Sequence, residues 1–335
     1  MKPTWLITGG AGFIGSNFLR LAYQRTDGRL VILDALTYAG NLANIKDLLT
    51  QPNVEFIHGD ITDSDLVEKI FQNHNITQVI NFAAESHVDR SILGPKAFIK
   101  TNIEGVFTLL EAAKNAWNGN FNNRLFLHVS TDEVYGSLKP NDSPRDETAP
   151  YRPNSPYASS KAASDHLVRA WNKTYGLPTL LTNCTNNYGP WQFPEKLIPL
   201  VILNALDGKE LPVYGDGLQI RDWLHVSDHC EALLLILERG KVGETYNIGG
   251  NCERTNLTIV ERICDAVDGL LDKKMGSTRS LIRHVTDRPG HDRRYSLNTS
   301  KLNRELGWTS KQSLDTSIPE LVRWYFENRE WAGKK

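Results

Sequence analysis

The stretch TWLITGGAGFIG, residues 4–15, decides the fold of this 335-residue chain. Its apolar start, Thr4–Thr8, is typical of a buried strand, and Gly9, Gly12 and Gly15 follow in a turn before a helical pattern over 16–25. Because glycine has no Cβ atom, the backbone N–H groups of such a turn can approach a pyrophosphate at a helix N-terminus. The order of strand, glycine turn and helix therefore predicts a dinucleotide site.

An acidic residue follows where the ribose of a dinucleotide would lie. Asp34 stands at the end of the next apolar run, and a carboxylate there accepts hydrogen bonds from the ribose hydroxyls and repels a 2′-phosphate. We therefore expect NAD rather than NADP. Asp60 and Ile61 end the third run, at the sheet edge where the adenine is expected. The alternative is a tight turn with strand-end acids that bind nothing.

Apolar runs alternate with helical patterns along the first half of the chain. The runs predict strands at residues 4–8, 30–33, 54–58, 78–82, 125–130 and 179–183, and amphipathic patterns predict helices over 65–71 and 96–117. This alternation is typical of an α/β protein with a Rossmann-type doubly wound parallel sheet. After Asn183, frequent Pro and Gly residues predict a smaller mixed α/β lobe. We expect an NAD-binding domain at 1–185, rejoined near 219–248, and a substrate-binding domain at 186–335.

The composition excludes several classes of partner. The 38 basic and 39 acidic residues leave a formal charge of −1, so bulk charge attracts neither nucleic acid nor a membrane surface. The chain has no apolar run long enough to span a membrane, and a strand-like segment leaves no room for a signal peptide. The four cysteines form no CxxC pair and are too sparse for a disulfide framework. These features favour a cytoplasmic protein.

Two Tyr-x-x-x-Lys pairs occur in the chain. On a helix this spacing places both side chains on one face, where the ammonium can stabilise a phenolate and make tyrosine a base. Tyr135 and Lys139 flank a glycine and precede a proline, which disfavours a helix. Tyr157 and Lys161 directly follow Pro156, which suits a helix start. We therefore assign catalysis to the second pair, with an unremarkable surface pair as the alternative.

A hydroxyl and two neighbouring carboxyls end the fifth predicted strand. Thr131, Asp132 and Glu133 thereby reach the carboxyl edge of the sheet, along which ligands of open α/β folds bind. Two acids in different environments can have separated pKa values, so that one serves as acid and the other as base. Elimination of water needs such a pair. A solvated loop that happens to contain Asp-Glu is the alternative.

Two histidines, His225 and His229, have a spacing that could bind a metal. The sequence offers no evident third ligand and no HExxH pattern, so we expect structural roles and no metal site.

The chain resembles the dTDP-glucose 4,6-dehydratases of the extended short-chain dehydrogenase/reductase superfamily. TGGAGFIG (8–15) and the YxxxK pair are shared by many sugar-nucleotide enzymes of that superfamily. Much narrower are AESHVDRS (84–91), the Asp132-Glu133 pair within STDEVYG (130–136), NNYGPWQFPEKLIP (186–199) and DRPGHDRRY (287–295). YNIGG (246–250) also matches. The resemblance spans nearly the whole chain.

This resemblance implies a lyase that converts dTDP-glucose to dTDP-4-keto-6-deoxyglucose and water, with NAD regenerated in each turnover. Tyr157, helped by Lys161 and Thr131, would take the proton of the sugar 4-hydroxyl during oxidation at C4. Glu133 would then remove the C5 proton while Asp132 protonates the departing C6 hydroxyl, and reduction at C6 would complete the cycle.

The resemblance also implies two sets of binding residues. Besides the three glycines and the Tyr–Lys pair, the cofactor would contact Phe13, Ile14, Asp34, Ala35, Leu36, Thr37, Asp60, Ile61, Phe82, Ala83, Ala84, Glu85, Thr101 and Asn187. The sugar nucleotide would contact Ser86, Thr131, Asn186, Lys196, Leu197, Pro212, Val213, Tyr214, Arg221, Asn256, Asp287, Arg288, Pro289, Gly290 and His291. Arginines suit a diphosphate because the guanidinium offers forked donors, although Arg221 could equally form a surface salt bridge.

The chain departs from the family pattern in three places. The segment 137–149 is short, His225 replaces an expected Tyr, and Asn251-Cys252 replaces a His-Asn-like pair. These changes concern the loops near the base and substrate rather than the chemistry. The family also implies a homodimer formed through two helices per subunit, here within 99–117 and 158–175.

Three other functions remain open. A UDP-glucose dehydratase would work by the same mechanism, since one methyl group on the base is worth only ~1–3 kcal/mol to a pocket. A sugar-nucleotide 4-epimerase needs the Tyr–Lys pair but not Asp132 and Glu133. A non-catalytic NAD-binding scaffold would have no need for any of these catalytic side chains.

Overall fold

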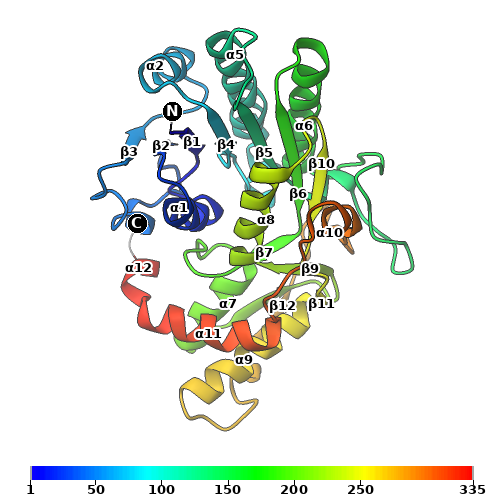
Figure 1. The fold of residues 1–335 in the computed structure, drawn as a ribbon. Coiled ribbons are helices and arrows are strands. Elements are labelled where there is room, and N and C mark those ends of the chain that lie inside the picture. Colours follow the sequence, from blue (N-terminus) through cyan, green and yellow to red (C-terminus); the bar gives the residue numbers. More distant parts are fainter. Residues whose placement is uncertain (1, 334–335) are drawn as a thin grey trace.

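A parallel sheet of seven strands forms the centre of the molecule (Figure 1). The computed structural model describes residues 2–333. The sheet order is β10-β6-β5-β4-β1-β2-β3, and neighbouring strands are parallel throughout. Its strands are β1 (Thr4–Thr8), β2 (Arg29–Asp34), β3 (Val54–His58), β4 (Gln78–Asn81), β5 (Leu125–Thr131), β6 (Thr179–Cys184) and β10 (Thr245–Ile248). The predicted Rossmann-type α/β fold is confirmed, and β1 and β3 have the predicted bounds.

Alternating side chains of the strands supply two apolar cores, one on each face of the sheet. In β1, Trp5 and Ile7 join one core while Leu6, between them, joins the other. Residues of α1 (Phe13–Arg25), α8 (Val226–Arg239) and α10 (Ser300–Leu306) complete the first core. Those of α2 (Ser64–His74), α5 (Gly105–Trp117) and α6 (Pro156–Tyr175) complete the second. Coverage of both faces explains why these strands read as continuous apolar runs.

The predicted helix over 96–117 is divided into three segments. They are α4 (Pro95–Phe98), a π-helical turn η2 (Ile99–Glu104) and α5. Asn102, in the π-helical turn, is buried and accepts a hydrogen bond from the backbone N–H of Glu85 (2.9 Å). π-Helical turns are frequent at functional sites, and this one positions the loop after β4.

A second lobe lies below the main sheet in Figure 1. It contains β7 (Asn186–Tyr188), β9 (Ile220–His225) and β11 (Glu253–Thr255) in one small sheet and β8 (Leu211–Tyr214) with β12 (Ile282–Val285) in another. Its apolar core lies among α7 (Leu197–Leu206), α9 (Asn256–Leu270) and α11 (Leu314–Glu327). The predicted return to the main sheet near 219–248 corresponds to α8 and β10, whereas β9 belongs to the small sheet. The domain boundary at 185 stays a prediction.

The remaining elements are short. They are η1 (Leu42–Asn44), α3 (Val88–Leu93), η3 (Asp132–Tyr135), η4 (Thr278–Leu281) and α12 (Arg329–Gly333). Among residues 2–333, no helix combines the length and the apolar character that crossing a membrane requires.

The C-terminal helix α12 reaches back to the glycine turn of the first domain. The Trp331 indole N–H donates to Asn44 Oδ1 (2.7 Å), and the Asn44 side chain donates to the carbonyl of Ala11 (2.8 Å). Trp331 also packs against Trp324 of α11 and Trp191, whose ring lies 5.3 Å from the Arg20 guanidinium. The end of the described chain therefore helps to hold the turn in place.

The tightest backbone approach in the glycine turn gives a stability prediction. A Cβ atom on Gly15 would lie 2.2 Å from the carbonyl oxygen of Gly9, whereas one on Gly269 in α9 would meet nothing within 4 Å in the described part of the chain. We expect Gly15→Ala to destabilise the protein by roughly 1–3 kcal/mol through overpacking. Gly269→Ala, the matched control, should be neutral or stabilise by up to about 1 kcal/mol. Thermal unfolding of both variants checks this, and equal melting temperatures would contradict it.

Candidate active site

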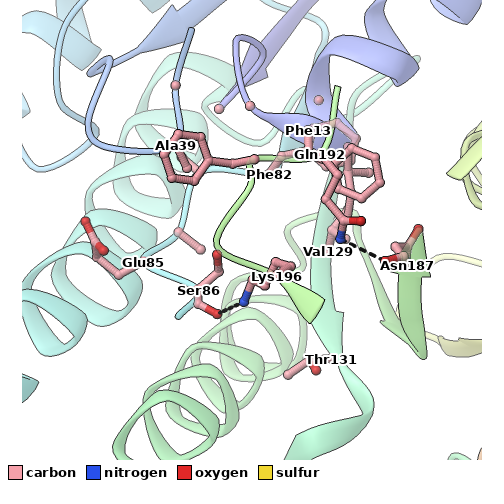
Figure 2. Close-up of a pocket in the computed structure, with 18 of the residues that line it drawn as sticks. Phe13, Ala39, Phe82, Glu85, Ser86, Val129, Thr131, Asn187, Gln192 and Lys196 are labelled. Carbon is pink, nitrogen blue, oxygen red and sulfur yellow. Dashed lines mark hydrogen bonds between the residues drawn. The ribbon is translucent and has the colours of Figure 1, made fainter. Parts of the chain in front are cut away.

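A deep cavity opens at the carboxyl ends of the parallel strands and extends toward the second lobe (Figure 2). Its lining comes from the glycine turn, from the loops after β2, β3 and β4, from the end of β5, from the start of α6 and from the segment 184–198. Dinucleotides bind at this edge of doubly wound sheets. The cavity therefore lies where the sequence places both the cofactor and the chemistry.

The glycine turn is shaped to receive an anionic group. Gly12 precedes the first turn of α1, and within residues 2–333 its N-cap position makes no side-chain hydrogen bond to that turn. Helix N-termini without a side-chain cap leave backbone N–H groups available to a phosphate. The missing Cβ of Gly15 is what permits the close packing of the turn. These features fit the pyrophosphate of a dinucleotide.

Asp34, at the end of β2, organises the same turn. Its carboxylate accepts the backbone N–H of Ala11 (2.9 Å) and that of Leu36 (2.8 Å). Leu36 adopts a left-handed backbone conformation (φ 49°), which folds the loop around the carboxylate. Burial raises the pKa of Asp34, while the two backbone N–H groups lower it. Each carboxylate oxygen keeps a lone pair that can accept a ribose hydroxyl.

Most of the predicted cofactor residues share the cavity. Those on its lining are Gly9, Gly12, Phe13, Ile14, Gly15, Asp34, Ala35, Thr37, Asp60, Ile61, Phe82, Ala83, Ala84, Glu85, Thr101, Tyr157, Lys161 and Asn187. Leu36 falls outside the lining found for residues 2–333 and acts through its backbone.

Thr131, Asp132 and Glu133 lie together where β5 ends. Thr131 caps the short helix η3, accepting the backbone N–H of Glu133 (3.3 Å), and its hydroxyl donates to Asp132 (3.2 Å). Asp132 is buried, and Glu133 is half-buried on the cavity wall. Neither acid lies in a solvated loop, so that alternative is excluded.

The environments of the two acids differ. Burial, and next the charge of Glu133, raise the pKa of Asp132 well above its ordinary value. Burial also raises the pKa of Glu133, but the cationic side chains of Arg288, Lys196 and Arg221 oppose that rise. Asp132 therefore has the stronger tendency to remain protonated, and Glu133 has the cations that stabilise a carboxylate.

Tyr157 and Lys161 begin helix α6. Ser155 caps the helix by accepting the backbone N–H of Ala158 (3.0 Å), and Pro156 occupies its first turn. Both side chains line the cavity and are buried. The other pair is not helical, because η3 ends at Tyr135 and Gly136 has a φ of 74°. The choice of the second pair as the helical one is confirmed.

The protein's own groups oppose ionisation of Tyr157. Burial, then the nearby Glu133 carboxyl, raise the pKa of Tyr157 well above its ordinary value, although a hydrogen bond with Thr131 lowers it. The sequence predicted a phenol that Lys161 brings near neutrality. In the structure, burial and the nearby carboxyls oppose that ionisation, and the Thr131 hydroxyl favours it.

The predicted substrate residues fall into two groups. Ser86, Thr131, Asn186, Lys196 and Leu197 line the cavity, and the Lys196 ammonium donates to the carbonyl of Ser86 (2.9 Å), as Figure 2 shows. The others lie outside the lining found for residues 2–333: Pro212, Val213, Tyr214, Arg221, Asn256, Asp287, Arg288, Pro289, Gly290 and His291.

The two arginines outside the lining nevertheless act on the acids through their positive charge. Arg221 and Arg288 both lower the pKa of Glu133. Arg221 is only 5% exposed, lies 4.4 Å from the ring of Tyr295 and donates to the carbonyls of Ile220 and Asp292. Of the two roles left open for Arg221, the surface salt bridge is therefore wrong.

Several residues of the cavity were missed from the sequence. Gln192 donates to the carbonyl of Asn187 (3.0 Å; Figure 2), and Glu195 receives the Arg90 guanidinium (3.3 Å). Both belong to the narrow string at 186–199, so the string itself was the available signal. Cys184 and Trp223 also line the cavity, and as apolar strand residues they gave no signal.

His225 and His229 have separate structural roles. His225 caps α8 by accepting the backbone N–H of Ser227 (3.3 Å) and packs against the ring of Tyr188. His229 is fully buried, and its Nδ1 bonds the side chain of Asn187 (2.9 Å). Burial lowers the pKa of His229 to about 3, which favours the neutral ring. Because the Asn187 amide nitrogen donates to the carbonyl of Thr185 (2.9 Å), its Oδ1 faces His229 and accepts the Nδ1–H.

A dinucleotide turn and a Tyr–Lys pair thus meet in one cavity of a parallel sheet, the arrangement of the extended short-chain dehydrogenases. A family model described as GDP-mannose 4,6 dehydratase matches residues 6–321. A dTDP-glucose 4,6-dehydratase of Xanthomonas campestris is 56% identical over 98% of this chain and 95% of the relative. That of Salmonella typhimurium is 52% identical over 98% of this chain and 94% of the relative.

A solved structure of a related protein supports the same family. DesIV, a dTDP-glucose 4,6-dehydratase from Streptomyces venezuelae solved with NAD and TYD bound, superposes with a TM-score of 0.91. It is 45% identical, and the match covers 98% of this chain and 99% of that one. The chain belongs to the dTDP-glucose 4,6-dehydratase family.

Proposed function

We infer that the chain is an NAD-dependent lyase that converts dTDP-glucose to dTDP-4-keto-6-deoxyglucose and water. Relatives named for this activity match nearly the whole chain at 50–56% identity, and the related DesIV was solved with NAD bound. The observation that carries the proposal is the pair of unlike acids, Asp132 and Glu133, beside the Tyr157–Lys161 pair. Oxidation at C4 needs only the second pair, whereas loss of water needs both.

The glycine turn and Asp34 would hold the cofactor by its pyrophosphate and ribose. When bound, NAD supplies the acceptor for oxidation at C4 and the donor for reduction at C6, so the reaction is redox-neutral overall. The chain's own residues then have three tasks: to move the proton of the 4-hydroxyl, to move the proton at C5, and to protonate the leaving hydroxyl.

Tyr157 takes the first of these tasks. Its phenolate accepts the proton of the 4-hydroxyl. The Thr131 hydroxyl, which lowers the pKa of Tyr157 by a hydrogen bond, stabilises the negative charge. The Lys161 ammonium would add to this stabilisation, as the family resemblance implies. The resulting 4-keto group acidifies the C5 proton. Glu133 removes that proton as a carboxylate, and the buried Asp132 protonates the C6 hydroxyl as it departs. Glu133 later returns a proton to C5.

The cations near Glu133 also suit the substrate. Lys196 on the cavity wall and Arg221 and Arg288 outside it all act on Glu133 by their positive charge, and a diphosphate needs such donors in a chain of net charge −1. The remaining predicted contacts, from β8, the start of α9 and the loop 287–291, would then form the nucleotide end of the site. The proposed boundary between an NAD-binding domain (1–185) and a substrate domain (186–335) follows this division between the cofactor end and the substrate end of the site.

We further infer a cytoplasmic homodimer. Phe107 on α5 and Tyr175 on α6 are 46% and 48% exposed, and both pack against Trp171 on the surface shared by these helices. Such an exposed aromatic patch is typical of an interface. The four reduced cysteines, three of them buried, are compatible with the cytoplasm.

The redox balance gives the first test of this function. Incubation with dTDP-glucose should yield a 4-keto sugar, detected by its absorbance in alkali, without accumulation of NADH. UDP-glucose in a parallel reaction measures the base preference. Formation of NADH in proportion to product would show a simple dehydrogenase, and product without loss of the C6 hydroxyl would show an epimerase-type enzyme.

Replacement of each tyrosine tests the choice of base. Tyr157→Phe removes one oxygen from the cavity and should lower turnover by roughly 10²–10⁴-fold, the usual contribution of a positioned acid–base group. Tyr135→Phe is the matched control, because that hydroxyl is also buried but bonds Asn247 (3.1 Å) away from the cavity. Steady-state rates with dTDP-glucose decide, and equal losses in the two variants would refute the assignment.

Replacement of each acid tests the elimination step. Glu133→Gln should block removal of the C5 proton, seen as lost solvent-deuterium incorporation at C5, while oxidation at C4 persists. Asp132→Asn should impair departure of the C6 hydroxyl. A substrate with fluorine in place of that hydroxyl should restore turnover of Asp132→Asn but not of Glu133→Gln, because fluoride leaves without being protonated. Loss of roughly 10²-fold or more is expected for either acid with dTDP-glucose. Near-wild-type dehydration by either variant would refute these roles.

A further inference from the structure

A second layer of buried charge lies behind the Tyr157–Lys161 pair. Asp165 is one helical turn beyond Lys161 on α6, and the two side chains are 2% and 3% exposed. His128 of β5 is fully buried and lies against both, with its Nε2 3.3 Å from Lys161 Nζ and 3.5 Å from Asp165 Oδ1. None of the roles derived above uses Asp165 or His128, although burying a carboxylate and an imidazole costs free energy unless they are paired.

The hydrogen bonds fix the protonation of His128. The Thr8 hydroxyl donates to Asn81 Oδ1 (2.6 Å), so the Asn81 amide nitrogen faces His128 Nδ1 (3.0 Å) and donates to it. Nδ1 is therefore unprotonated, and the proton of the neutral ring is on Nε2. Burial and the charge of Lys161 lower the pKa of His128 well below its ordinary value, in agreement with a neutral ring. Nε2 lies 3.5 Å from Asp165 Oδ1 and 3.2 Å from the Ser164 hydroxyl.

The Lys161 ammonium consequently has no acceptor in His128. Its Nζ lies 3.3 Å from His128 Nε2, but that nitrogen carries a proton, and the hydrogen bond it does make is to the carbonyl of Val129 (2.9 Å). A carbonyl does not neutralise a charge. Within the described residues, the charges that favour its protonated form are those of Asp165 and next of Cys184, a buried thiol with its pKa raised to about 12. Asp165, whose Oδ1 lies 3.5 Å from the same His128 nitrogen, is therefore the nearby carboxylate that favours its charge.

Asp165 is held in the form that this role needs. Its Oδ2 accepts the Ser130 hydroxyl (2.9 Å) and the Tyr151 hydroxyl (3.0 Å). The Tyr151 oxygen itself accepts the Asn183 amide (3.2 Å), so its proton is directed at Asp165. Oδ1 has no hydrogen-bond partner among residues 2–333 and is left to interact through charge. Tyr135 and His166 both pack against Tyr151, and the charge of Glu147 acts on Tyr135, so these are further titratable groups on this side.

We propose that Asp165 is a positioning residue for the dehydration: its buried carboxylate is the counter-charge that keeps Lys161 protonated, and Lys161 in turn supports the Tyr157 phenolate. Burial lowers the pKa of Lys161 to about 8, and Asp165 opposes that fall. Burial raises the pKa of Asp165 to about 7, with Lys161 opposing it, so each charge stabilises the other. The proposal rests on the assigned role of the Tyr–Lys pair.

The test is the alkaline limb of the pH profile of kcat/KM. Asp165→Asn keeps the shape of the side chain and removes its charge, which lowers the pKa of Lys161. The alkaline limb should move to lower pH by about one unit or more, the effect of losing an opposite charge at close range, with KM for dTDP-glucose little changed. Tyr151→Phe, the matched control, removes a buried hydrogen bond to the same carboxylate but keeps the charge, so its limb should stay near that of the wild type.

A limb that stays in place in Asp165→Asn, or moves equally in Tyr151→Phe, would overturn the proposal. Thermal unfolding at pH 8 provides a second measurement that needs no activity. When introduced into the wild type, Asp165→Asn should lower the melting temperature. When introduced into Lys161→Met, it should raise the melting temperature, because in that variant the buried carboxylate has lost its cationic partner. An equal loss in both backgrounds would also overturn it. If Tyr157→Phe keeps its turnover while Asp165→Asn gives the expected results, then Asp165 and Lys161 stabilise each other as proposed, but the catalytic role assigned to Tyr157 is wrong.

Discussion

Ser130 and Thr131 end β5 and Asp132 begins η3, and all three are buried, so their polar groups depend on partners within the protein. The solutions differ. Ser130 donates to Asp165, Thr131 donates to Asp132 and caps η3, and burial raises the pKa of Asp132 well above its ordinary value. Because an unpaired buried charge is costly, the cations Lys161, Arg221 and Lys196 must lie nearby. The composition of the site follows from the burial of this one strand end.

The same burial bears on the loss of water. A Tyr–Lys pair beside a dinucleotide suffices to oxidise and reduce a sugar, and such a site would tolerate water beyond the reacting carbon. Two adjacent carboxyls with unlike protonation require that one of them be drier than the other. Here Asp132 is buried while Glu133 reaches the cavity wall beside three cationic side chains. The two carboxyls of one dipeptide therefore differ in their tendency to hold a proton.

The sequence predicted the fold well because its strongest signals are local. A glycine turn, a strand end and a proline before a helix each constrain the few residues beside them, and the bounds of β1, β3 and the start of α6 followed from such patterns. The burial of Arg221 and the network of His128 with Asp165 depend on which elements pack together, so no local pattern could reveal them. Trp331 is a further case, since its partner Asn44 is 287 residues away.

That last contact has a consequence for the order in which the protein is completed. During synthesis from the N-terminus, β1, the glycine turn and α1 leave the ribosome first and can fold with their neighbours. The carbonyl of Ala11 is held by Asn44, and the indole that anchors Asn44 belongs to α12, at the other end of the described chain. A nascent chain can therefore assemble its main sheet early, but its dinucleotide turn receives full support only after translation has passed residue 331.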